Sequence, residues 1–519
     1  MTKTFCQGAL ASVAALVSLT APARADVTPQ DVWNQWETYM ASFGYQIDIQ
    51  PEADGGNLRF ADFSMALPVP ADPASGKEGG IVRFSFGDVA LIDRGDGSVS
   101  VEMPASTPIT IRGESLGDEN FVVKGTMTST GYSTVATGNP GDITYTFEAA
   151  ELALAIDELT GDDGKTVTPG TLQIALQGAA GTSRVENASG PTTLEQTITM
   201  ARLTYAMDIT DPDPAKPGHF RAQGTLEGLT SAGGGMIPDN FDPLAIPAAL
   251  ADGYAMNGTL SYAAGQGSLD FAEDGDSFRY ASTSQGGSLS FGMSAEALTY
   301  DVQARDIDFT LESSEIPFPV ASTMGAMGFG MTLPVLKGEA EQDFTARLTL
   351  TDVTVPEPLW MMVDAGGTLP HDPVTAELVT SGKARLFVDI FDEKATAELA
   401  AGGGTPGEVT YFSLDSLLLK AGGATIAATG GFDIDNTAKS ALNPAMPAFA
   451  GKVDLRLTGV GGLIGNLAQM GLIPMPQAMM VTGMIQQLGK PESGPDDVSA
   501  LIEVTKESQL TVNGAPLPF

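Results

Sequence analysis

Apolar and polar residues alternate with a period of two along much of the chain. In "EALTYDVQARDIDFTLE" the apolar positions include Leu298, Tyr300 and Val302, and the positions between them are polar. "DFTARLTLTDVTV" repeats this pattern with Phe344 and Leu348. The period predicts strands with one buried and one solvated face. Gly, Asp and Asn clusters such as "TGDDGKT" separate most of these runs and predict hairpin turns. Strands and helices do not alternate regularly, which disfavours a doubly wound parallel sheet.

One segment near the start, "TPQDVWNQWETYMASFGY", has the period of a helix. Thr28 is suited to cap it, Pro29 fits its first turn, and Asp31 stands where a capping-box acid belongs. Gly44 suits its C-terminal end. We expect a helix that packs on a sheet through the apolar residues spaced three or four apart, which are Val32, Trp33, Trp36, Met40 and Phe43.

Residues 316–336 form the first of two charge-free, methionine-rich segments. Val320, Met324, Met327 and Met331 recur in it at helical spacing. Methionine gives an adaptable apolar surface, which suits irregular packing or a varied hydrophobic ligand. We expect this segment to pack on the apolar face of the sheet.

Residues 457–489 form the second charge-free segment, which is long enough to span a bilayer. Pro474 and Pro476 divide it, and its Asn and Gln side chains would need partners in lipid. We therefore predict two short amphipathic helices joined at "LIPMP" and largely covered, and no transmembrane helix in the mature chain. Either the protein's own core or a hydrophobic guest would cover them.

These patterns predict a mainly β protein. It would be one large curved antiparallel sheet, or two sheet-based lobes, with a few short amphipathic helices packed on the apolar face. A chain of 519 residues is longer than one ordinary compact core needs. We assign an N-terminal helix and an antiparallel β lobe to residues 26–310. Residues 311–519 would form a C-terminal β lobe with the Met-rich helical segments.

The first 25 residues have the pattern of a secretory signal peptide. Lys3 gives a basic start, residues 8–19 give an apolar core, and Ala23 and Ala25 give a small-residue cleavage site. Cys6 precedes the apolar core, where a lipid-anchor cysteine would follow it. We expect cleavage after Ala25, a mature chain without cysteine, and a periplasmic location.

The chain is strongly acidic, with 64 acidic and 26 basic residues and a formal net charge of −38. Such a surface repels phosphate backbones and anionic headgroups. We therefore expect no nucleic-acid partner.

Candidate catalytic residues are few. "GESLG" matches the nucleophile-elbow pattern with Ser115 at its centre, but a strand pattern follows it where a helix is required. The only histidines are His219 and His371, and either could serve as a base in principle. The carboxylate clusters lack the spacing of a calcium loop. We predict no catalytic, cofactor-binding or metal-binding residues and no cofactor.

Several stretches resemble the alphaproteobacterial family known as domain of unknown function 2125. They are "IPFPV", "MTLPV", "LW", "LPHDP", "PAFAGKVDLRLTGVGGLIGNLAQMGLIP" and "LTVNGAPL", and the first helix is also similar. The resemblance covers most of the chain and is most specific from about residue 315 onward. It implies an exported protein of the cell envelope and brings no activity or site residues. The pattern of strand endings is more distantly similar to AsmA-like envelope proteins, which are connected with lipid movement and outer-membrane assembly.

The expected function is therefore that of an exported cell-envelope protein without catalytic activity. It would use the concave apolar face to bind a lipid or another hydrophobic ligand by burial in a groove, or it would scaffold envelope assembly together with envelope proteins. A structural or assembly protein without a ligand is one alternative. A serine hydrolase that uses Ser115 is the other.

Overall fold

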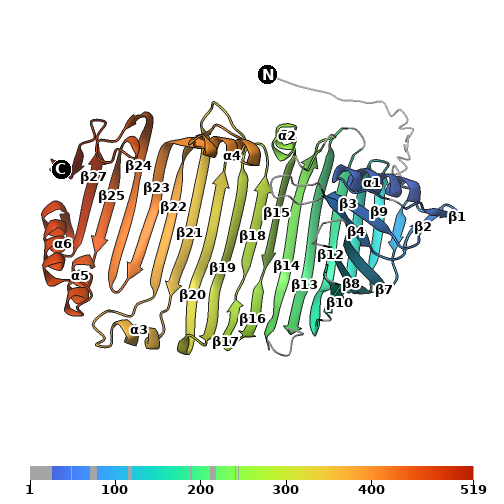
Figure 1. The fold of residues 1–519 in the computed structure, drawn as a ribbon, viewed down its shortest axis with the longest axis horizontal. Coiled ribbons are helices and arrows are strands. Elements are labelled where there is room, and N and C mark those ends of the chain that lie inside the picture. Colours follow the sequence, from blue (N-terminus) through green and yellow to red (C-terminus); the bar gives the residue numbers. More distant parts are fainter. Residues whose placement is uncertain are drawn as a thin grey trace, which may run out of the picture.

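The computed structural model describes residues 26–517, except residues 48, 70–78, 115–119, 163, 168, 188–189, 211–217, 240 and 244. The predicted signal peptide and Ser115 therefore lie outside the described residues. The described part of the chain forms one antiparallel sheet, and short helices lie at its ends and along its long edges (Figure 1).

The N-terminal strands are short. They are β1 (Glu52–Asp54), β2 (Asn57–Phe60), β3 (Ser64–Val69), β4 (Gly80–Ser85), β5 (Val89–Asp93), β6 (Val99–Glu102), β7 (Ser106–Glu114), β8 (Phe121–Thr130) and β9 (Ser133–Asn139). The ladders β1–β2–β5–β6–β9 and β3–β4–β7–β8 both lead to β10, which pairs with β8 and with β9.

Long strands and four shorter ones within residues 255–293 make the middle of the sheet. They are β10 (Asp142–Thr160), β12 (Thr171–Glu186), β13 (Thr192–Thr210), β14 (His219–Ile237), β15 (Ala255–Tyr262), β16 (Ala264–Glu273), β17 (Asp276–Ser284), β18 (Gly287–Met293), β19 (Leu298–Ser313), β20 (Ile316–Leu333), β21 (Gln342–Val353), β22 (Val374–Leu386), β23 (Gly407–Ala421), β24 (Ala424–Lys439) and β25 (Pro447–Thr458), with β11 (Thr166–Val167) beside β10. Each pairs with its neighbour in antiparallel fashion.

The C-terminal edge consists of β26 (Lys490–Gly494), β27 (Asp497–Val504), β28 (Leu510–Val512) and β29 (Ala515–Pro516). The helices are α1 (Pro29–Ser42), α2 (Ile246–Ala251), α3 (Glu357–Val363), α4 (Glu393–Ala401), α5 (Val460–Gln469) and α6 (Met475–Leu488). Figure 1 shows α1 at the N-terminal end of the sheet and α5 and α6 at the opposite end. No helix among these residues is long and apolar enough to cross a membrane.

The sheet is continuous where two lobes were an alternative. The boundary expected between residues 310 and 311 falls inside β19, which pairs with β17, β18 and β20. The mainly β, curved and antiparallel architecture predicted from the period of two is confirmed.

The predicted N-terminal helix is also confirmed. The Thr28 hydroxyl accepts a hydrogen bond from the Asp31 N–H, and the Asp31 carboxylate accepts one from the Thr28 N–H, so the capping box is complete. Val32 and Trp33 are buried against the first strands, and Gly44 takes a positive φ of 82° directly after the helix ends.

The helical interpretation of residues 316–336 is wrong, because most of this segment is β20. Val320, Met324, Met327 and Met331 share one face of a strand. A spacing of four equals two strand repeats. The spacing of three between Met324 and Met327 arises because the pairing with β19 is interrupted opposite Gly325. A strand with such an interruption therefore imitates the helical period.

The two helices predicted in residues 457–489 are present as α5 and α6. The expectation that they are largely covered is wrong for α6. Only Ala478 is buried in that helix, and several of its large apolar side chains face solvent.

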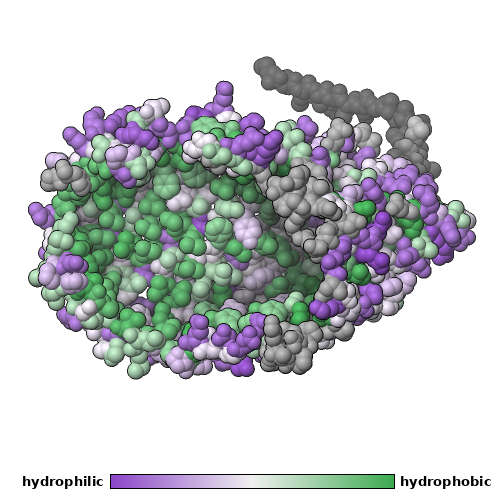
Figure 2. Space-filling view, in the orientation of Figure 1, coloured by the Kyte–Doolittle hydropathy of each residue, from purple (hydrophilic) through white to green (hydrophobic). Residues whose placement is uncertain are grey.

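A line of irregular residues runs across the strands and curves the sheet. Gly131, Gly178 and Gly228 have φ of 63°, 60° and 60°, and ladder pairing is interrupted at their level. Asp306 and Asp352 take the same conformation farther along. Register is the same on both sides of each interruption at the three glycines, so no residue is inserted there; we call these aligned irregularities bulges because they disrupt the ladder locally, as inserted residues do. Their alignment lets the long strands bend together, and the sheet is hollow on one face (Figure 2).

Two clusters of buried apolar residues stabilise the margins of the sheet. One lies beneath α1 and includes Trp33, Phe60, Phe63 and Leu91. The other includes Ile237, Leu250, Tyr254 and Val335, against which Tyr39 and Phe43 of α1 also pack. Both clusters lie away from the centre of the hollow face.

Candidate functional site: an apolar trough

One row of inward-facing residues crosses the sheet through fifteen successively paired strands. We call this the central row. It consists of Thr134, Phe147, Gly181, Ile198, Ser231, Leu260, Leu289, Val302, Phe329, Leu348, Leu378, Leu417, Ala428, Leu455 and Ala500. No member of the row is charged. It is almost entirely apolar from Leu260 onward.

The next residue along each strand faces the other way and is mostly polar. This row includes Glu148, Thr199, Thr230, Ser261, Ser288, Gln303, Thr349 and Glu377. Side chains alternate between the two faces of a strand. The sheet therefore has one apolar and one polar face along most of its length.

The apolar face is open to solvent. Phe291, Phe329 and Leu348 keep 42, 41 and 43 % of their surface exposed although they lie in the middle of the sheet. Figure 2 shows hydrophobic residues lining a hollow that is bordered by more polar residues. No second layer of described residues covers these side chains. We call this hollow face the trough.

The dimensions of the trough follow from strand geometry. Fourteen steps of about 4.8 Å between fifteen strands give a length of roughly 67 Å. Two further apolar rows flank the central row, one through Phe291, Tyr300 and Met331 and one through Met327 and Leu350. Rows two residues apart are separated by roughly 6.7 Å, so the trough is roughly 13 Å wide between the two flanking rows.

The trough ends at α1 in a pocket of about 400 Å³. Its lining is almost entirely apolar and comprises Trp36, Phe63, Phe86, Val89, Val101, Met103, Met127, Tyr132, Thr134, Tyr145 and Phe147. Thr134 and Phe147 are the first members of the central row. The pocket is thus the N-terminal end of the trough, where α1 lies.

Polar contacts hold α1 over this pocket. The Tyr145 hydroxyl donates to Gln35 Oε1 at 2.7 Å, and Gln35 Nε2 donates to the Val185 carbonyl at 2.9 Å. Burial raises the pKa of Tyr145 and of Tyr132. Both phenols are therefore neutral at ordinary pH, which keeps this end of the trough free of charge.

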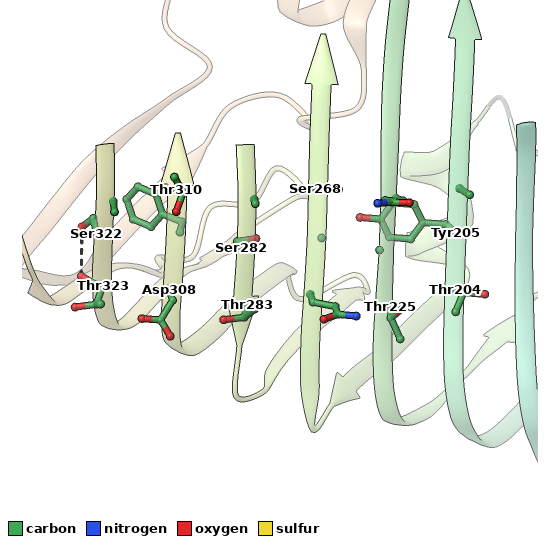
Figure 3. A pocket seen from close by; sticks show the side chains of 18 of the residues that line it. Thr204, Tyr205, Thr225, Ser268, Ser282, Thr283, Asp308, Thr310, Ser322 and Thr323 are labelled. Carbon is green, nitrogen blue, oxygen red and sulfur yellow. Dashed lines mark hydrogen bonds between the residues drawn. The ribbon is translucent and has the colours of Figure 1, made fainter. Parts of the chain in front are cut away.

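A second hollow, of about 860 Å³, lies where β13, β14, β16, β17, β19 and β20 run side by side. Figure 3 shows Thr204, Thr225, Thr283, Asp308 and Thr323 on neighbouring strands. Register places these side chains in one polar row. The row contains a single carboxylate and no cation, so it offers hydroxyl and amide groups without a charged centre.

The two histidines lie in different parts of the sheet. His219 Nε2 lies 3.2 Å from Asp270 Oδ1 on β16, and His371 Nδ1 lies 3.1 Å from Glu357 Oε2 on α3. Following the pairing order from β14 to β22 takes six steps, or roughly 29 Å. The structure therefore does not bring the two histidines together.

His371 belongs to a compact turn. Its ring stacks on Trp360 with centroids 4.4 Å apart, and the adjacent Asp364 is buried. Asp364 accepts hydrogen bonds from the backbone N–H groups of Leu369 and Thr368, which hold its pKa below the usual range. These contacts order the "LPHDP" turn. Among the described residues, no group of three or more His, Asp or Glu side chains is placed to hold a metal ion.

A family model described as an uncharacterized protein conserved in bacteria (DUF2125) matches residues 241–517, which is more than half of the chain. The chain belongs to this family. No curated protein matches the chain. The DUF2125 region begins shortly before α2 and includes the C-terminal two-thirds of the central row, as well as α5 and α6.

Sequence reasoning identified the inward side chains of this DUF2125 protein and an apolar concave face, but not the extent to which that face is open. The alternation at Leu298, Tyr300 and Val302 gave their common face correctly. It could not show that this face lacks a covering layer. The aligned bulges had one sequence signal, a glycine that breaks the alternation, as at Gly178 in "IALQGAAG".

Proposed function

We propose that this DUF2125 protein binds molecules with long hydrocarbon chains, such as lipids, along the trough. The observation that carries the proposal is the uncharged central row, whose large side chains remain about two-fifths exposed. Water in contact with such a surface is unfavourable, and apolar burial contributes about 25 cal/mol per Å². A hydrocarbon chain laid on the row would remove both surfaces from water.

The shape of the trough favours chains over compact ligands. Each leaflet of a bilayer contributes about 15 Å of hydrocarbon, half of the roughly 30 Å core. A trough of roughly 67 Å is therefore about four chain lengths long. It would hold several chains, or one chain at several positions, with polar headgroups at the rim. The mechanism is burial of apolar surface without covalent chemistry, and the proposal assigns no role to Ser115.

We further propose that the protein acts in the cell envelope after export. Support comes from the signal-like pattern of residues 1–25. Fractionation of cells that express the full chain should place it in the periplasm, with Asp26 as its N-terminal residue. A cytoplasmic protein that retains Met1 would contradict this location.

The ligand proposal is tested with the full mature chain and a matched pair of variants. Leu348 faces the trough on β21, and Thr345 faces the polar side of the same strand and is exposed. Native mass spectrometry would detect co-purified lipid, and titration with an NBD-labelled phospholipid would measure affinity. We expect Leu348→Asp to weaken binding at least tenfold and Thr345→Asp to leave it unchanged.

Three results would oppose the proposal. They are wild-type protein without bound lipid or affinity for the probe, equal loss in both variants, and full binding by Leu348→Asp. If lipid is absent while crosslinking in cells recovers an envelope complex, the assembly role without a ligand is favoured instead.

A further inference from the structure

We propose that α6 is a docking element that seats the C-terminal end of the protein on the surface of a lipid bilayer. This inference rests on α6 itself and does not require the trough to bind lipid.

The exposed side of α6 carries methionines among uncharged polar residues, the glutamines at 477, 486 and 487. Met479, Met480 and Met484 keep 63, 60 and 50 % of their surface exposed, and Leu472 and Met475 before them keep 53 and 47 %. The side that faces the protein carries Ala478, Ile485 and Leu488, of which only Ala478 is buried. A helix with methionines toward solvent is unusual for a soluble surface, where large contiguous apolar patches are rare.

The segment is also free of charge in a chain of high net charge, −38. Charged residues number 64 + 26 = 90 in 519, or about one in six. Residues 457–489 contain none, although about six would be expected at that frequency. This neutral segment can therefore approach headgroups without repulsion from charges of its own.

Helix α6 also ends beside the apolar face of the sheet. Gly489, which directly follows α6, lies against Val498 of β27, since a Cβ at Gly489 would stand 3.0 Å from Val498 Cβ. Val498 pairs with Leu457 at the C-terminal end of an inward apolar row. The C-terminal end of α6 thus lies at the end of this inward row.

A bilayer fits this face better than a second copy of the chain. Two copies with a net charge of −38 each would repel one another when brought together. A helix of 14 residues is about 21 Å long, which is too short to span a bilayer but suits an orientation in the plane of its surface. Flexible methionine side chains also suit a fluid apolar medium.

The test is flotation of the full mature chain with phosphatidylcholine vesicles, which are zwitterionic. The triple variant Met479→Gln, Met480→Gln and Met484→Gln keeps helix propensity and charge while it removes the apolar face. We expect wild-type protein to float and the triple variant to lose at least tenfold in partition. Circular dichroism and the melting temperature would verify that the variant is folded.

The trough variant Leu348→Asp separates the two proposals, because it should lose the phospholipid probe yet still float. A Met480→Trp variant should show blue-shifted fluorescence and quenching by brominated lipid. The docking inference is overturned if the wild type fails to float or if the triple variant floats equally. It is also overturned if light scattering shows a wild-type dimer that the triple variant dissociates, since the face would then be an interface between copies.

Discussion

Neighbouring residues on one strand have opposite environments in this protein. Leu348 is in the trough, whereas Thr349 on the same strand pairs with Gly328 and Glu377 on the polar face. A strand alternates with a period of two, so the sequence determines which side chains share a face. The residue scale is therefore where sequence reasoning was most reliable. It fails only where a bulge shifts the alternation, as at Gly178 and Gly228.

The bulge glycines give the first prediction. Gly178 has φ of 60°, and a Cβ placed there would lie 3.1 Å from Ala201 Cβ. Gly178→Ala should lower the free energy of unfolding by about 1–2 kcal/mol, because L-residues are strained in the left-handed region. Gly258 has no positive φ and no atom closer than 4.0 Å, so Gly258→Ala serves as the control and should be near neutral. Urea unfolding measures both, and an equal cost would argue against the bulge geometry.

Asp497 gives a pH-dependent prediction. Its side chain accepts hydrogen bonds from Arg456 Nε at 3.1 Å and Nη2 at 3.0 Å, and from Ser493. These partners hold the pKa of Asp497 far below its usual range. A lowered folded-state pKa stabilises the native protein above the unfolded value near pH 4, and this stabilisation is lost as pH falls.

Asp497→Asn should therefore melt at a lower temperature than wild type at pH 7, and the difference should shrink below about pH 4. Differential scanning calorimetry across this range would measure it. Asp343→Asn is the control, since Asp343 pairs only with Lys383 at 3.8 Å and its side chain is 83 % exposed. A difference that persists unchanged at pH 3 would contradict the assigned ion pair.

At the scale of elements, local sequence signals predicted where helices begin, but they did not predict how the helices pack. The capping box at Thr28 and Asp31 and the paired prolines at 474 and 476 correctly indicated α1 and the start of α6. The helix predicted in residues 316–336 is a strand. Small residues and a bulge place the apolar residues of β20 three or four positions apart, which is also the spacing of a helix face. Periodicity alone does not separate a helix from such a strand; the pairing of β20 with β19, the strand before it, does.

The cap of α1 supports an element-scale prediction. Thr28→Ala removes the hydroxyl that accepts from the Asp31 N–H, and such changes cost about 1 kcal/mol. Helix α1 lies over the pocket at the N-terminal end of the trough. In Thr28→Ala, the rate of amide hydrogen exchange should therefore increase in α1 before it increases in the long strands. Thr38→Ala is the control, since Thr38 is exposed within the helix and contacts only the Asn34 carbonyl. Equal exchange in both variants would show that the cap does not hold α1.

At the scale of the whole molecule, the decisive feature could not be inferred from the sequence. Alternation in a strand predicts that one face avoids water, and a second layer of the same chain usually supplies the cover. Here successive strands extend one sheet in place of folding back on it, so the strand order determines the absence of a cover. A sequence shows which face is apolar, whereas register and topology show that described residues leave it open.

An open apolar face makes stability depend on its occupant. A ligand that binds only the native state adds RT ln(1 + [L]/Kd), or about 2.7 kcal/mol at one hundred times Kd. We therefore expect protein stripped of lipid by detergent exchange to melt at a lower temperature, and phospholipid to restore the melting temperature in a concentration-dependent way. Leu348→Asp should respond much less than Thr345→Asp.

The strands that the ligand stabilises test binding in the trough more directly than the size of the change in melting temperature. Chains laid along the central row would restrict opening of the strands that expose the most apolar surface. Hydrogen exchange of β18–β22 should therefore slow on ligand addition more than exchange of β1–β6, where buried residues already form a core beneath α1. If hydrogen exchange slows only in the strands that line the pocket beneath α1, the ligand binds only at the N-terminal end of the trough. Uniform slowing would indicate that lipid stabilises the fold without occupying the trough.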